Sequence, residues 1–275
     1  MSSIGLALGG GGAKGLAHVP ILEEFDRAGV SPSAIAGTSI GAIIGAMYAA
    51  GRSGQFIREF ASSHIPTSEE SLGDKLRKIF GSSIADAFSF NFGRGSLLKH
   101  DKLDDFFTEA FGVTTFEELK IPLKVVAGDF WARTEVVFES GDLISAVRAS
   151  MAIPGIFQPI DINGRILVDG GVVNPLPFDL LRGHCDRIVA VNVQGSKTPG
   201  ENPMPRTMDT IFGAFEILEA ALVAERLKSG EPDLRLRPEI HDVRALEFHK
   251  AHQIYRGAEP EALKLRDWLA SPTYS

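Results

Sequence analysis

The chain has 275 residues, of which 28 are basic and 35 acidic, so its net charge is −7, and 44% of them are hydrophobic. This content can bury a substantial core, and the charge, without a dense Lys/Arg block, argues against a nucleic-acid partner. A lone cysteine, Cys185, excludes an internal disulfide and a Cys-rich zinc site. The N-terminus lacks a signal-peptide n-region, and the apolar runs fall short of the roughly 18 residues of a membrane span. We therefore expect one cytoplasmic domain over residues 1–275, soluble or peripheral to a membrane.

The first element is predicted to be a buried strand over residues 4–8, followed by a glycine loop and a helix over 16–28. The loop pattern Gly-x-Gly-x-x-Gly formally matches a dinucleotide fingerprint, and its lysine also suggests a P-loop. The dinucleotide interpretation lacks the acidic residue expected at the end of the second strand. The P-loop interpretation fails because Gly15, instead of Ser or Thr, follows Lys14.

An anion site or an oxyanion hole is the interpretation of this loop that remains. Its backbone N–H groups lie at a helix N-terminus, where donors and the helix dipole both favour negative charge. Lys14 is interpreted as a residue that holds the loop. The candidate residues of the oxyanion hole are Gly10, Gly11, Gly12, Lys14 and Gly15.

The second unit is predicted to be a strand over residues 34–36, a sharp turn, and an apolar helix from residue 40 to residue 50. Between them, Gly-Thr-Ser-Ile-Gly matches the G-x-S-x-G nucleophile elbow, with Ser39 as the nucleophile. Gly37 and Gly41 are expected to let strand and helix pack closely. The alternative is a tight turn whose serine caps the helix. Two successive strand-loop-helix units would place the glycine loop beside Ser39.

Residues 52–112 differ in character and are predicted to form a helical, Phe-rich insert. Amphipathic helices are expected over 53–63 and 101–111. Between them, Phe80, Phe88, Phe90 and Phe92 follow a basic cluster formed by Lys75, Arg77 and Lys78. Core packing is the ordinary explanation of these aromatic residues. A lid or acyl-chain groove is the alternative, with weak peripheral contact to a membrane.

The α/β alternation resumes after the insert. An aspartate, Asp169, directly follows a predicted strand over 165–168 and precedes Gly170 and Gly171, which permit a tight turn. Such an aspartate either directs its carboxylate into a crevice or is a plain turn residue. The other expected elements are strands over 123–127, 135–139, 187–193 and 234–236 and helices over 143–151 and 208–229, followed by a helical C-terminus to residue 269.

A serine nucleophile needs a base, which in an α/β-hydrolase is a histidine that follows the acid in the chain. The candidates are His184, His241, His249 and His252. However, that fold places several strands before its elbow, and about 35 residues are too few for them. A direct pair of Ser39 and Asp169 is the more economical interpretation.

Taken together, these motifs resemble the patatin-like phospholipase family, in particular its short bacterial branch. The resemblance rests on the glycine loop at 10–15, the elbow at 37–41 and the Asp-Gly-Gly at 169–171, and it extends to 147–155 and 174–177. It implies a three-layer α/β/α fold with a mainly parallel central sheet. It also implies a Ser39–Asp169 dyad, an oxyanion hole from the glycine loop, no metal or other cofactor, and hydrolysis of lipid acyl esters.

Because a carboxylate is a weak base for a serine hydroxyl unless it is desolvated, we expect apolar surroundings for Asp169. Two other classes of function remain open at this stage. One is a lipid-binding or regulatory protein on a hydrolase scaffold. The other is a dinucleotide-binding oxidoreductase.

Overall fold

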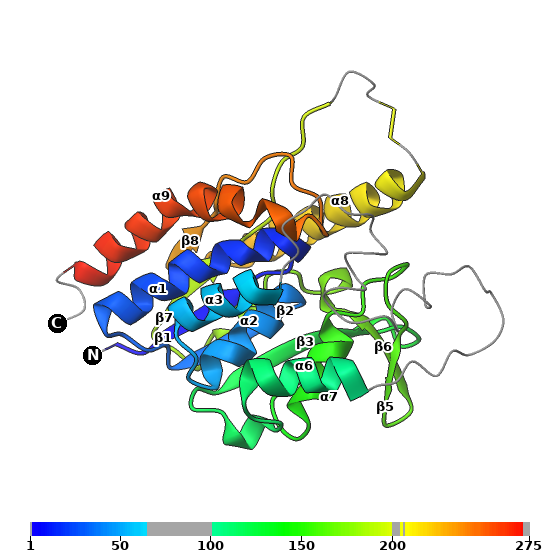
Figure 1. Ribbon diagram of the computed structural model, residues 1–275, viewed down its shortest axis with the longest axis horizontal. Helices are drawn as coiled ribbons and strands as arrows, with labels where there is room; N and C mark the ends of the chain where they lie inside the picture. Colours follow the sequence, from blue (N-terminus) through cyan, green and yellow to red (C-terminus); the bar gives the residue numbers. More distant parts are fainter. Residues whose placement is uncertain (1, 65–100, 200–203, 206, 272–275) are drawn as a thin grey trace.

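The protein is a three-layer α/β/α structure built on an eight-stranded sheet, seen here in a computed structural model (Figure 1). The structure describes residues 2–64, 101–199, 204–205 and 207–271. The strands are β1 (Ile4–Leu8), β2 (Ala34–Thr38), β3 (Leu123–Asp129), β4 (Thr134–Phe138), β5 (Ile160–Ile162), β6 (Arg165–Asp169), β7 (Arg187–Val191) and β8 (Leu234–Leu236).

Strand pairings in the sheet are parallel from β3 to β8 and antiparallel among β3, β4, β5 and β6. Its order is β5-β6-β3-β2-β1-β7-β8, and β4 pairs with β3 off this path. The pairs from β3 through β2, β1 and β7 to β8 are parallel. Strands β4 and β6 run antiparallel to β3, and β5 runs antiparallel to β6. The prediction of a mainly parallel sheet is thus confirmed for its centre, whereas β5 and the antiparallel pairings were not foreseen.

Strands β2 and β6 share one edge of β3. Residues 125 and 126 of β3 pair with β4 as well as β2, and residues 127–129 pair with β4 as well as β6. Since β4 occupies one edge throughout, β2 and β6 follow one another along the other edge. The last residue of β2 is opposite Val126 and the last residue of β6 is opposite Ala127, so the two strands end at neighbouring positions.

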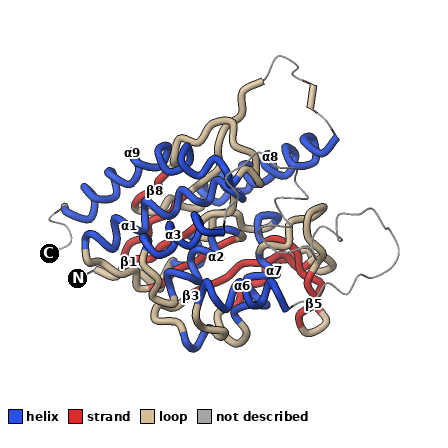
Figure 2. The backbone as a smooth tube through the Cα atoms, in the orientation of Figure 1, coloured by secondary structure: helices blue, strands red, loops and turns tan. Residues whose placement is uncertain are grey.

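Helices lie on both faces of the sheet (Figure 2). Two apolar clusters, one on each face, hold them there. Leu6, Leu8 and Ile35 point to the larger cluster and alternate with Ala7 and Ala36, which point to the smaller one. The larger cluster includes side chains of α1 (His18–Ala28), α2 (Ile40–Ala49), α3 (Gly54–His64), α6 (Asp101–Phe111), α7 (Leu143–Ser150) and α9 (Ala251–Ala270).

The opposite face is covered by the 3-10 segment η4 (Phe178–Leu181) and the long helix α8 (Thr207–Lys228). Val223 of α8 is buried in the smaller cluster together with Phe178. Helix α8 is therefore attached to the sheet from the side opposite α1, α2 and α9.

Most predicted elements are confirmed to within one or two residues. The exceptions lie at the first helix and near the C-terminus. The first helix begins with a 3-10 turn, η1 (Gly12–Ala17), before α1. The expected helical C-terminus is wrong for residues 237–247, which form loop and turn, and helix resumes with η5 (Phe248–Lys250) and α9.

The two helices that flank the predicted insert are confirmed as α3 and α6. Phe107 and Phe111 of α6 are fully buried, and its Phe106 ring lies 5.4 Å from that of Phe60 in α3. Both helices thus belong to the main core. The Phe-rich centre of the insert, with Phe80, Phe88 and the nearby basic cluster, lies outside the described residues.

None of the helices in the described part of the chain is long and apolar enough to cross a membrane.

Candidate active site

Ser39 connects β2 to α2 in a conformation that few residues other than glycine adopt. Its φ is 54° and its ψ is −122°, and the residue is 5% exposed. A non-glycine residue at positive φ is strained, and such strain is concentrated at functional sites. This sharp turn matches the predicted nucleophile elbow and places the hydroxyl at the N-terminus of α2, where the helix dipole favours an anion.

The two glycines of the elbow are required by the close approach of backbones. A Cβ on Gly37 would lie 2.6 Å from the carbonyl oxygen of Gly41 and 2.7 Å from Cα of Ala42. A Cβ on Gly41 would overlap the carbonyl oxygen of Leu8. Strand β2, helix α2 and the end of β1 therefore pack in direct backbone contact, as expected of these glycines.

The structure brings Ser39 and Asp169 together. The Ser39 hydroxyl donates a hydrogen bond of 2.6 Å to Oδ2 of Asp169, and the backbone N–H of Gly171 donates one of 2.7 Å to Oδ1. A serine has a single hydroxyl proton, and here the acceptor of that proton is a carboxylate. A Cβ on Gly170 would overlap the carbonyl oxygen of Val126, so this turn fits tightly against β3.

Burial makes Asp169 a stronger base than an ordinary aspartate. The residue is 1% exposed, and desolvation raises its pKa to about 6, against the lowering effect of its hydrogen bonds with Ser39 and Gly171. We expected apolar surroundings, but a second carboxyl group, that of Glu219, is buried near Asp169. The pKa of Glu219 is raised first by burial and then by the charge of Asp169.

The glycine loop lies next to Ser39. A Cβ on Gly10 would be 3.5 Å from the carbonyl oxygen of Thr38 and 3.6 Å from Cβ of Ser39. The N–H of Gly10 itself donates to the carbonyl of Pro175 at 2.9 Å. Gly11 and Gly12, at the N-terminus of η1, have positive φ and no backbone acceptor among the described residues. Their N–H groups are therefore the candidate donors of this loop for an oxyanion.

Lys14 holds this loop to α8. Its ammonium group lies 2.7 Å from Oε1 of Glu216, whose Oε2 lies 2.6 Å from Lys197. Lys14 is 5% exposed. Gly15 is needed for a different contact, since a Cβ there would overlap the side chain of Ile40, the residue after Ser39. Lys14 thus has the structural role expected of it. Its partner, Glu216, could not be identified from the sequence.

Ser150, at the end of α7, is a further site residue that sequence reasoning missed. Its hydroxyl accepts a hydrogen bond of 2.8 Å from the N–H of Ser39, and it is fully buried. The segment 147–155 around it resembles the family, but no local pattern assigns a role to this serine.

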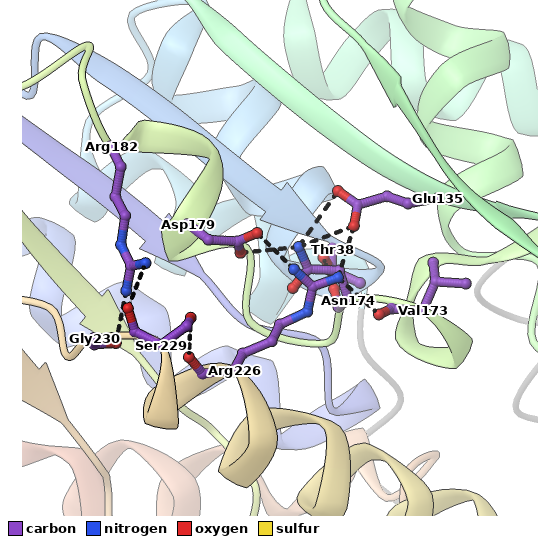
Figure 3. Close-up of polar contacts among 9 residues, drawn as sticks. All are labelled: Thr38, Glu135, Val173, Asn174, Asp179, Arg182, Arg226, Ser229 and Gly230. Carbon is purple, nitrogen blue, oxygen red and sulfur yellow. Dashed lines mark hydrogen bonds and ion pairs between the residues drawn. The ribbon is translucent and has the colours of Figure 1, made fainter.

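A polar network fixes the segment that follows Asp169 (Figure 3). Arg226 of α8 binds Glu135 at 2.7 Å, Asp179 at 2.5 Å and the carbonyl of Val173 at 3.1 Å. Next to it, the side-chain N–H group of Asn174 donates to both carboxylates, and the backbone carbonyl of Asn174 accepts from the Thr38 hydroxyl at 2.7 Å (Figure 3). The network thereby connects α8 with the end of β2.

His18 is the histidine closest in sequence to the loop, and its position explains why it is no base for Ser39. Its Nε2 is 2.9 Å from the carbonyl of Gly9, and complete burial lowers its pKa to about 4. His241, one of the considered bases, is paired with Ser196 at 2.6 Å. The Ser39 proton is instead donated to Asp169.

The fold and this geometry define an α/β protein with a nucleophile elbow, whose serine donates its proton to a buried carboxylate. The comparison with family models agrees, because the model described as patatin-like phospholipase matches residues 6–182, more than half of the chain. The chain belongs to the patatin-like phospholipase family.

Several curated proteins are similar in sequence. An uncharacterized NTE family protein of Mycobacterium tuberculosis is 35% identical over 195 residues, which cover 70% of this chain and 50% of that protein. The human patatin-like phospholipase domain-containing protein 6 is 30% identical over 286 residues, covering 92% of this chain and 19% of that protein. A lysophospholipase of Aspergillus fumigatus is 29% identical, covering 92% and 17%. The chain spans half or less of the length of these relatives.

Among solved structures, that of VipD from Legionella pneumophila matches with a TM-score of 0.54 and 13% sequence identity, covering 97% of this chain and 67% of that one. This likeness concerns the fold.

Proposed function

We propose that the protein is a serine hydrolase that cleaves fatty-acyl esters of lipids through a Ser39–Asp169 dyad and an acyl-enzyme intermediate. The observation that carries the proposal is the 2.6 Å hydrogen bond from the strained Ser39 to the buried Asp169. Membership of a phospholipase family supports a lipid as the substrate.

In the acylation step, Asp169 accepts the hydroxyl proton while Oγ of Ser39 attacks the ester carbonyl. The carbonyl oxygen becomes an oxyanion, to which the N–H groups of Gly11 and Gly12 and the N-terminus of α2 can donate. One such donor typically contributes about 10²–10³ in rate. Collapse of the intermediate expels the alcohol, which takes the proton from Asp169, and leaves the acyl group on Ser39.

In the deacylation step, water takes the place of the alcohol. Asp169, ionised again, accepts a proton from the water as the hydroxide attacks the acyl-enzyme carbonyl. The second tetrahedral intermediate collapses to a free fatty acid, and the proton returns to Oγ of Ser39. No cofactor enters either step.

We also propose that the protein contacts a lipid surface. We expect this contact to be weak and local, because the net charge of −7 opposes binding to anionic membranes. The Phe-rich centre of the insert is the proposed contact region. Cytoplasmic localisation is likewise a proposal.

The principal alternative is a lipid-binding or regulatory protein in which the dyad turns over slowly. The two are distinguished by measuring hydrolysis of p-nitrophenyl esters of increasing acyl length and of lysophospholipids, with Ser39→Ala as control. We expect turnover that depends on Ser39 and improves with chain length, since each buried CH₂ contributes about 0.8 kcal/mol. Equal rates for wild type and Ser39→Ala on every ester would contradict the proposal.

A further inference from the structure

The face of α8 that is turned toward the sheet carries charged residues at helical spacing. Phe212, Glu216, Glu219, Val223 and Arg226 follow one another at intervals of three or four residues and therefore lie on one side of the helix. Glu216 is paired with Lys14, and Arg226 with two carboxylates. These ion pairs anchor α8 on both sides of Glu219.

Glu219 itself has no ion pair among the described residues, although it is only 6% exposed. Its carboxyl group lies against Gly171: a Cβ on Gly171 would overlap Oε1 of Glu219 and would be 3.1 Å from Oδ1 of Asp169. Oε1 of Glu219 and Oδ1 of Asp169 therefore both lie next to the position that a Cβ at residue 171 would occupy. Gly171 is not at positive φ, so close packing, and not backbone conformation, requires a glycine here.

We propose that Glu219 is a positioning residue for Asp169. From α8, the Glu219 side chain fills the space beside Gly171 and thereby keeps Oδ2 of Asp169 in hydrogen-bond contact with the Ser39 hydroxyl. Oδ1 is held by the N–H of Gly171, and Glu219 packs against that same residue. If Glu219 were absent, Gly171 and the carboxylate it holds would lose their support on the α8 side. The catalytic consequence rests on the proposed function.

The protonation of Glu219 suits this role. Burial and the charge of Asp169 raise its pKa to about 8, with Glu216 acting in the same direction and Lys14 opposing. At neutral pH the carboxyl group of Glu219 is thus uncharged beside an ionised Asp169, and the two carry one negative charge between them. Ionisation of Glu219 above pH 8 would set two like charges beside Gly171.

The first experiment compares Glu219→Gln with Glu219→Ala in ester hydrolysis, with Glu225→Gln on the exposed side of α8 as matched control. Glutamine keeps the shape and neutrality, so we expect kcat within about threefold of wild type at pH 7. Alanine should lower kcat about ten- to hundredfold with little change in KM, as a displaced catalytic group does. Wild type should also lose activity above about pH 8, and Glu219→Gln should not.

The second experiment needs no activity. The raised pKa means that the unfolded state releases the Glu219 proton near pH 4.5 while the folded state keeps it to about pH 8. Between these values the unfolded state binds fewer protons, so wild type loses stability as pH rises. The melting temperature of Glu219→Gln should therefore rise relative to wild type across pH 5–8, whereas that of Glu225→Gln should not.

The contact with Gly171 is tested by a double-mutant cycle on the melting temperature. Gly171→Ala should destabilise the wild type more than it destabilises Glu219→Ala, which has room for the added methyl group. An equal effect in both backgrounds, or an unchanged kcat in folded Glu219→Ala, would overturn the proposal. If wild type hydrolysed no ester, the proposed function would fail separately, and the stability experiments would still decide whether Glu219 is neutral and packed on Gly171.

Discussion

The hydroxyl of Ser150 lies 2.8 Å from the backbone nitrogen of Ser39 and accepts its hydrogen bond. Because Ser39 has a strained backbone, this bond helps to hold the elbow in place. Ser150→Ala leaves a buried N–H group without its acceptor, which typically costs about 1–3 kcal/mol. We expect lower stability in chemical denaturation and a several-fold lower kcat. Wild-type values of both would show that the elbow does not depend on Ser150.

The ion pair of Lys14 and Glu216 should behave as a unit. Glu216→Leu leaves the ammonium group of Lys14 buried without this partner. Breaking a fully buried ion pair lowers the free energy of unfolding by about 3–5 kcal/mol, and we expect a smaller loss here because Glu216 is partly exposed. Lys14→Met combined with Glu216→Leu should be more stable than Glu216→Leu alone. Urea unfolding of Lys14→Met, Glu216→Leu and the double variant completes the cycle, and strictly additive effects would contradict the coupling.

The dependence of activity on pH follows from Asp169. Its pKa is raised to about 6, and only the ionised form can accept the Ser39 proton. Thus kcat/KM should fall about tenfold per unit as pH decreases below about 6, and should be level between pH 7 and 8. A profile that stays level down to pH 5 would exclude a base with this raised pKa.

The histidines should be dispensable for catalysis, because Ser39 donates its proton to Asp169. Substitution of His184, His241, His249 or His252 by Gln should cost less than about tenfold in rate, whereas loss of a true base costs several orders of magnitude. A chelator should also have no effect. One histidine with a loss as large as that of Asp169→Asn would favour a triad.

Local sequence patterns were sufficient for the elbow and for Asp169. Gly37, Gly41 and Gly170 lie within a few residues of two strand ends, where close backbone contacts leave no room for a Cβ, and such constraints appear in the sequence as glycines at fixed spacing. The alternation of apolar strands and helices likewise predicted the centre of the sheet.

Contacts between distant segments could not be predicted in this way. Ser150 meets Ser39 across 111 residues, and Glu216 meets Lys14 across 202. Neither a serine at a helix end nor a glutamate on a long helix has a local signal, because its role is set by tertiary packing. The same holds for β5, a three-residue strand that is defined by its pairing with β6.

The most direct test of the proposed mechanism is labelling with a serine-reactive fluorophosphonate, located by mass spectrometry of the digested protein. Wild type should be labelled at Ser39, and Ser39→Ala should not be labelled. Asp169→Asn should react at least about a hundredfold more slowly, since its amide cannot accept the proton. Folded wild-type protein that remains unlabelled, or Asp169→Asn that reacts at the wild-type rate, would contradict the dyad.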